Sequence, residues 1–197
     1  MSEFWIFTET GWRHVLDIKN YSLILFLIAL AVPYSFKEWK KLLLLTGIFN
    51  LGCFVALLLS AYGVIIIKPV LVEFLIPITV LILALFNLFT SGKSSKGMAV
   101  NLIGFVMLFF GMVHGLEFST YFKSGYTGNA SDKIVSLLQF ELGIIAAQTF
   151  FLFIVLVVGY IIYTFFRFSK RDFSLVLSSF VIGVALPMIL ENQIWKN

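Results

Sequence analysis

Six long apolar runs dominate this sequence and restrict how the chain can fold. They cover residues 21–36, 42–67, 69–90, 98–122, 134–166 and 173–190. A helix of about 20 apolar residues crosses the hydrocarbon core of a bilayer, so each run is read as one membrane span. Because lipid offers no hydrogen-bond partners to the backbone, these spans are expected to be helices. The sequence therefore predicts an all-α polytopic membrane protein, a bundle of six transmembrane helices that forms one domain over residues 1–197.

The composition agrees with this class and excludes others. The chain is 60% hydrophobic and only 12% charged, whereas a soluble domain has roughly 45–50% apolar and about 25% charged residues. Its 14 basic residues are spread along the chain, so the lipid bilayer is the expected partner and nucleic acid is not. The single cysteine, Cys53, rules out an internal disulfide and a multi-cysteine metal site.

Two of the runs differ in length from an ideal span. Run 21–36 has only 16 residues and is expected to borrow from the segment before it. In that segment Phe4, Trp5, Phe7 and Trp12 predict an N-terminal amphipathic helix that lies in the membrane interface. Run 134–166 has 33 residues, so its helix is expected to tilt or to extend beyond the hydrocarbon.

Basic residues in the connections predict the orientation. Six basic residues fall on one side of the predicted membrane and eight on the other, in the first, third and fifth connections. These eight are Lys37, Lys40, Lys41, Lys93, Lys96, Arg167, Lys170 and Arg171. Lys and Arg are retained on the cytoplasmic side of membrane proteins. We therefore expect these three connections to be cytoplasmic and both termini to lie outside.

His114 and Glu117 interrupt the apolar run 98–122, which contains no other ionisable residue before Lys123. Their spacing of three places both side chains on one face of a helix. An ionisable group at this depth costs a few kcal/mol, so it is expected to face the protein interior or a cavity. Two interpretations are open: a metal or proton site, and a buried His–Glu contact that holds two helices together.

A second pair, His14 and Asp17, repeats this spacing just before the first apolar run. In the predicted topology both pairs lie toward the outer face. Two imidazoles and two carboxylates suit a borderline divalent ion such as Ni²⁺, Co²⁺ or Zn²⁺. The alternative is that His14 and Asp17 are ordinary interfacial residues.

Three further residues complete the candidate metal ligands. Glu73 and Glu141 lie near the outer ends of runs 69–90 and 134–166, and Cys53 lies inside run 42–67. Each has a simpler interpretation. In that interpretation Glu73 faces water near a span end, and Cys53 behaves as a small hydrophobic residue, as a lone buried cysteine usually does. Glu141 forms a polar stripe with Gln148, two helical turns away, of the kind that often joins helices in membranes.

The stretch from Phe109 to Phe118, with His114-Gly-Leu-Glu117 inside it, resembles the HupE/UreJ family. The segment Gly11-x-x-His14-x-x-Asp17 and the segment from Val72 to Pro77 are also similar to the bacterial branch of that family. The resemblance covers at least residues 7–190. It implies a six-span hydrogenase- or urease-associated permease linked to nickel or cobalt uptake, located in the bacterial inner membrane.

The sequence departs from the family pattern at the residues that carry its chemistry. Where the family usually has Gly-x-Asp-His after its first histidine, this chain reads Asn20-Tyr21-Ser22-Leu23. Where the second span commonly carries Gly-His-Ser or Gly-His-Thr, it reads Gly52-Cys53-Phe54. A thiolate ligand at Cys53 would shift the preference toward softer ions.

Three functions follow from these observations as alternatives. The first is a permease for a divalent transition-metal ion, which enters from outside and binds His114, Glu117, His14 and Asp17 in turn. The second is a non-transporting membrane subunit or assembly factor, in which the same residues hold helices together and partner subunits are membrane proteins. The third is an intramembrane metalloenzyme. No nucleotide-binding loop, serine-hydrolase elbow or zinc-protease motif occurs in the sequence, so an enzyme is not expected.

Overall fold

The computed structural model describes residues 3–91, 100–128 and 132–196, and within these it contains helices and no strands. The main helices are α1 (Glu3–Leu16), α2 (Tyr21–Ala31), α3 (Trp39–Ala61), α4 (Pro69–Thr90), α5 (Val100–Gly125), α6 (Lys133–Phe165) and α7 (Lys170–Leu190). Three short 3₁₀ turns accompany them, η1 (Ile18–Asn20), η2 (Phe36–Glu38) and η3 (Gln193–Lys196). The predicted all-α fold is confirmed.

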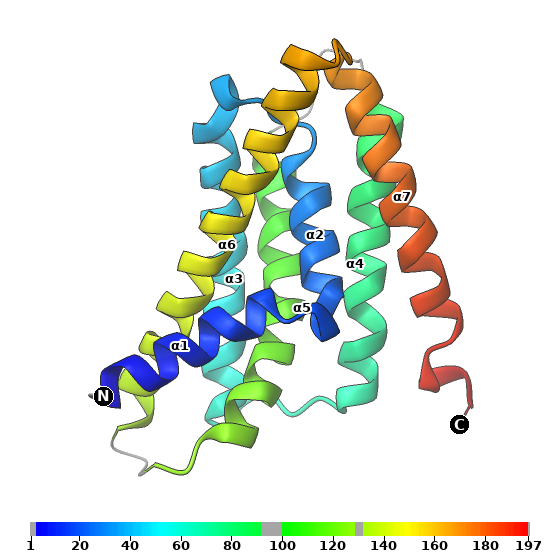
Figure 1. Cartoon of the computed structure of the whole chain (residues 1–197). Helices are drawn as coiled ribbons and strands as arrows, with labels where there is room; N and C mark the ends of the chain where they lie inside the picture. Colours follow the sequence, from blue (N-terminus) through cyan, green and yellow to red (C-terminus); the bar gives the residue numbers. More distant parts are fainter. Residues whose placement is uncertain (1–2, 92–99, 129–131, 197) are drawn as a thin grey trace.

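The long helices α3 to α7 run up and down the bundle in alternating directions (Figure 1). Each of the five is long and apolar enough to cross a membrane. Both termini lie at one end of the bundle, whereas the α2–α3 and α6–α7 connections lie at the other (Figure 1). The predicted alternation of the connections is therefore confirmed. Lys93 and Lys96 lie outside the described residues.

The helix of the first span is shorter than the run 21–36, although it is joined to the segment before it as the sequence predicts. Helix α2 has 11 residues and ends at Ala31, so it covers about 16 Å, roughly half of the hydrocarbon thickness. Pro33 follows shortly after, and a proline cannot continue the helix. Helices α1 and α2 meet at a bend of 74°, and the pair makes a sixth span when its two parts are counted together.

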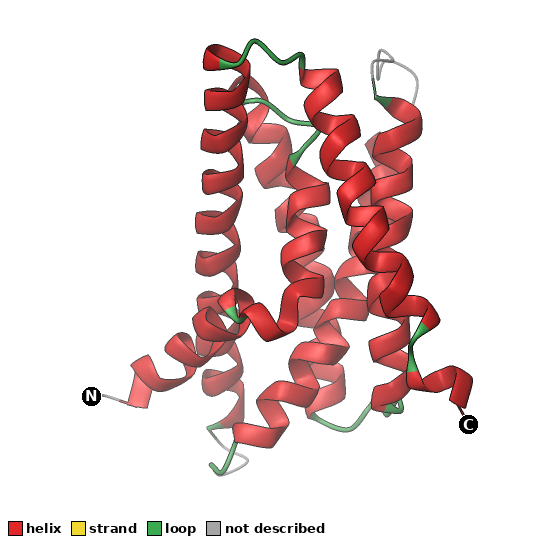
Figure 2. Ribbon diagram, turned by 45° about the vertical axis from the view of Figure 1, so that its right-hand side comes forward, coloured by secondary structure: helices red, strands yellow, loops and turns green. Residues whose placement is uncertain are grey.

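The short helix α2 occupies the interior of the bundle. Eight of its 11 residues are buried, and it packs against α4, α6 and α7. Asn87 of α4 donates its side-chain amide to the backbone carbonyl of Ala29 in α2, at 2.6 Å. This hydrogen bond ties the end of the half-length helix to a full-length one. Figure 2 shows the described elements as helices joined by loops.

Glycines allow two helix pairs to approach closely. Gly111 and Gly115 of α5 lie against the backbone of Phe49 and Cys53 in α3, where a Cβ atom would come within 2.0–2.2 Å of a carbonyl oxygen. Gly11 of α1 and Gly143 of α6 form the second contact of this kind. Small residues at such spacing let helix backbones pack in membranes. The first contact fixes Cys53 beside the turn of α5 that carries His114.

Candidate polar site in the bundle core

His114 lies at the centre of the bundle and is fully buried. Its ring packs against Phe26 of α2 and Phe49 of α3, with centroid distances of 4.8 and 5.3 Å. Its Nε2 lies 3.1 Å from the hydroxyl oxygen of Thr79 in α4. The imidazole therefore contacts three helices besides its own.

The hydrogen bonds of Thr79 fix the tautomer of His114. The Thr79 hydroxyl donates its one proton to the carbonyl of Ile76, at 2.7 Å, so its oxygen accepts from His114. Nε2 must then carry the ring proton, which leaves a lone pair on Nδ1 of the neutral ring. Nδ1 is buried and has no hydrogen-bond partner among the described residues. The structure thus presents an open imidazole lone pair inside the core.

A thiol and two carboxyl groups lie in the same part of the core. Cys53 of α3 is fully buried and lies within electrostatic range of Glu141 in α6 and Glu117 in α5. Glu141 is 5% exposed, and neither of its carboxyl oxygens has a hydrogen-bond partner in the part of the chain described. Glu117 is half-buried. An isolated carboxylate in the surroundings of Glu141 costs several kcal/mol unless a proton or a cation accompanies it.

His14 lies in an aromatic cage between α1, α5 and α6. Its ring is 4.1 Å from that of Tyr121, 5.4 Å from Phe118 and 6.3 Å from Phe140, measured between centroids. Phe118 lies one turn from His114 on α5, and Phe140 immediately precedes Glu141. His14 is therefore in the neighbourhood of the core site, on the side nearer the chain termini.

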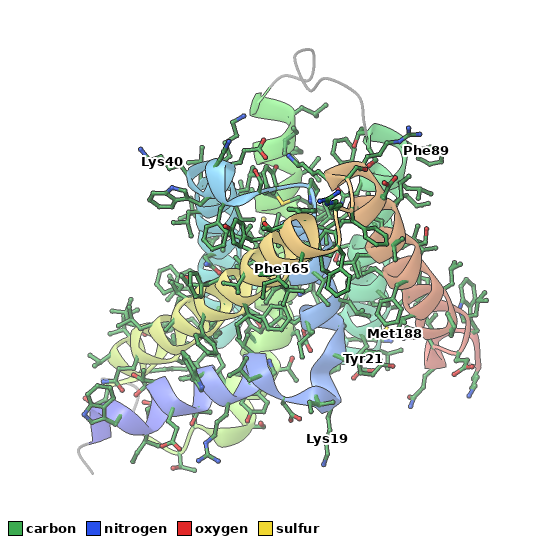
Figure 3. All side chains as sticks on the ribbon, turned by 45° about the horizontal axis from the view of Figure 1, so that its top comes forward. Lys19, Tyr21, Lys40, Phe89, Phe165 and Met188 are labelled. Carbon is green, nitrogen blue, oxygen red and sulfur yellow. The ribbon has the colours of Figure 1, made fainter. Side chains whose placement is uncertain are left out.

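Asp17 and Glu73 are placed differently from the other candidates. Helix α1 ends at Leu16, so Asp17 is beyond it; the side chain is exposed and accepts from the backbone N–H of Lys19 at 2.9 Å. Figure 3 shows Lys19 and Tyr21 at this junction of α1 and α2. Glu73 is exposed near the start of α4.

The candidate ligands do not form a ready-made metal centre. Among the described residues, no three His, Cys, Asp or Glu side chains form a group that could hold a metal ion. The structure places Cys53 within electrostatic range of Glu117 and Glu141 and against the turn of α5 that carries His114. His14 lies beside Phe118 and Phe140, whereas Asp17 and Glu73 are at the surface.

Sequence reasoning missed Thr79, which orients His114. Its only signal is a hydroxyl residue two positions after Pro77 in an apolar run. From the sequence, Gln148 is interpreted only as part of a polar stripe that joins helices. It is fully buried, and neither its Nε2 nor its Oε1 has a hydrogen-bond partner among the described residues.

Comparisons with known proteins agree with the sequence motifs. The family model described as HupE / UreJ protein matches residues 1–192. Neither the comparison with curated proteins nor that with solved structures gave a match. The family match spans nearly the whole chain, including every helix that contributes to the polar site, and the chain belongs to the HupE/UreJ family.

Proposed function

We propose that this protein is a permease for a divalent transition-metal ion of the nickel and cobalt type. The observation that carries the proposal is the open Nδ1 lone pair of His114. The same turn of α5 packs against Cys53, which lies within electrostatic range of Glu117 and Glu141. A neutral imidazole is a good ligand for these ions, and a thiolate adds affinity for softer ones. A cation also supplies the counter-charge that a buried Glu141 carboxylate lacks.

The hydrogen bond to Thr79 supports this role for His114. Histidines that bind metals almost always donate their second ring N–H to an acceptor, which fixes the tautomer and the ring orientation. Thr79 provides that acceptor, 3.1 Å from Nε2. Donors that do not close into one metal centre suit transport, because an ion must be bound strongly enough to enter and weakly enough to leave.

We infer the route from the arrangement of the termini and the polar residues. In the predicted orientation both termini lie outside, and His14 and His114 lie in the outer half of the bundle. The ion would pass from the level of His14 and Glu141 inward to Cys53 and His114. Location in the bacterial inner membrane and any partner subunits belong to the same proposal.

Transport into proteoliposomes tests the proposal. A metal-sensitive dye inside the vesicles should report influx of Ni²⁺, Co²⁺ or Zn²⁺ with the native protein. His114→Ala and Glu141→Gln should each abolish it while the protein stays folded. The matched control is Glu191→Gln, since Glu191 is an exposed carboxylate that follows α7. Influx that is unchanged in both core variants, or absent with all three ions, would refute the proposal.

One observation favours a second function, that of a non-transporting membrane subunit. The Thr79–His114 hydrogen bond joins α4 to α5 within a densely packed core, which is also what a purely structural histidine would do. Thermal unfolding with and without metal separates the two. A ligand that binds only the folded protein stabilises it by about 2.7 kcal/mol at a hundredfold excess over its dissociation constant, whereas a structural histidine gives no shift.

A further inference from the structure

A groove lies on the lateral surface of the bundle between the start of α3 and the middle of α6. It has a volume of about 310 Å³, and its lining residues are Phe36, Trp39, Leu42, Leu43, Thr149, Leu152, Phe153 and Leu156. Seven of the eight are apolar. Buried leucines form its floor, with Leu42 at 1% exposed and Leu152 at 2%, whereas Trp39 and Phe153 on its walls are about half exposed.

Aromatic rings line the groove toward the end of the bundle opposite the termini. There the Phe36 ring meets Phe153 and Tyr160 edge to face, with centroid distances of 6.0 and 6.1 Å. The helices that form the groove both expose apolar side chains to their surroundings, such as Leu44 of α3 and Ile154 of α6. The groove therefore opens toward the hydrocarbon of the bilayer, and an apolar chain is what fits it.

Positive charge borders this apolar surface. Lys37 in η2 and Lys40 and Lys41 in the first turn of α3 are all exposed. The one acid among them, Glu38, forms an ion pair with Lys170 of α7 at 2.5 Å. Lys40 keeps its amine 5.8 Å from the ring of Trp39, which lines the groove. Figure 3 shows Lys40 at this end of the bundle, away from Lys19.

We propose that the groove is a binding site for an anionic phospholipid, with one acyl chain against the α3 and α6 side chains and the phosphate held by Lys37 and Lys40. The apolar lining selects the chain, and the basic border selects the negative headgroup over a zwitterionic one. Basic clusters at the cytoplasmic ends of spans bind such headgroups. This site is separate from the polar core and does not depend on metal transport.

Quenching of Trp39 fluorescence tests the site. Trp5, Trp12 and Trp195 are replaced by Phe, so that Trp39 is the only reporter, and the protein is placed in vesicles containing brominated phosphatidylglycerol or brominated phosphatidylcholine. Phosphatidylglycerol should quench Trp39 more strongly at equal mole fraction. Lys37→Gln with Lys40→Gln should reduce that preference by about fivefold for each lysine. Thr149→Phe, which fills the groove, should reduce quenching by both lipids.

A matched double variant, Lys19→Gln with Lys68→Gln, removes two exposed lysines from the half of the bundle toward the termini and should keep the full preference. Equal quenching by the two lipids would overturn the proposal, as would a preference that survives loss of Lys37 and Lys40. So would unchanged quenching after Thr149→Phe, or displacement of the lipid by soluble glycerol phosphate, which would show a phosphate site without a chain. If the single-tryptophan protein fails to fold, native mass spectrometry of the unaltered protein decides instead. Retention of phosphatidylglycerol over phosphatidylcholine supports the site, and equal retention overturns it.

Discussion

Replacing Gly111 by alanine should destabilise the protein by separating α3 from α5. The new Cβ atom would lie 2.0 Å from the carbonyl oxygen of Phe49 and 2.9 Å from its carbonyl carbon. Ordinary van der Waals contact begins at 3.4 Å, so the helix backbones must move apart by more than 1 Å locally. No flexible side chain can give way, because every close atom belongs to the backbone of α3.

The expected cost lies in the upper part of the range for overpacked sites, about 2–3 kcal/mol. For a chain of this size each kcal/mol shifts the melting temperature by about 2–4 °C, so Gly111→Ala should melt roughly 4–12 °C lower. The assay is thermal unfolding of the detergent-solubilised protein, followed by tryptophan fluorescence and by the fraction that remains monodisperse.

Gly104→Ala is the matched control on the same helix. Its Cβ atom would meet only the Ile48 side chain, at 3.5 Å, which is ordinary contact, and alanine favours a helix over glycine by up to about 1 kcal/mol. Gly104→Ala should therefore leave the melting temperature unchanged or raise it. Equal melting temperatures for the two variants would show that α3 and α5 are not packed through Gly111, and the placement of Cys53 beside His114 would lose its basis.

Three other outcomes are expected. Thr79→Val should lower the free energy of unfolding by about 0.6–1 kcal/mol because His114 loses its acceptor, and an unchanged thermal melt would contradict that hydrogen bond. Metal influx should fall as the pH is lowered, because an imidazole must be neutral to bind a metal ion; influx that rises in acid would contradict an imidazole ligand. In a Cys53→Ala background, an impermeant thiol reagent added outside cells should label Val64→Cys and not Lys37→Cys, and the reverse result would invert the predicted orientation.

The sequence predicted the helices best where lipid alone decides the structure. The run 69–90 agrees residue for residue with α4, since Pro69 begins the helix and the apolar residues fill one span. Long helix α6 matches its 33-residue run to within one residue at each end. Gly52 also marks a close approach of α3 to α5, because a Cβ atom there would lie 2.2 Å from the Leu108 carbonyl oxygen.

The first span was not predictable in the same way, because its form depends on packing. The run 21–36 predicts a short span that borrows from the segment before it, whereas α2 is buried among α4, α6 and α7 and stops at Ala31. The bend between α1 and α2 also explains why Asp17 does not share a helix face with His14. Its spacing of three from His14 places two side chains on one face only within a continuous helix, and α1 ends at Leu16. His114 and Glu117 lie well inside α5, so the spacing argument applies to them.

The two interpretations of His114, ligand and helix contact, are not in competition at the level of geometry. The bond from Nε2 to Thr79 joins two helices, and the same bond forces the lone pair onto Nδ1. If His114 only joined helices, its buried Nδ1, without a partner among the described residues, would be a pure cost. Leaving a buried acceptor without a hydrogen bond costs about 1–3 kcal/mol. The unpartnered Glu141 carboxyl group adds a cost of the same kind elsewhere in the core. A cation that moved through the core, as we propose, would offset the two costs in turn, because it would accept the imidazole lone pair at one point and compensate the carboxylate charge at another.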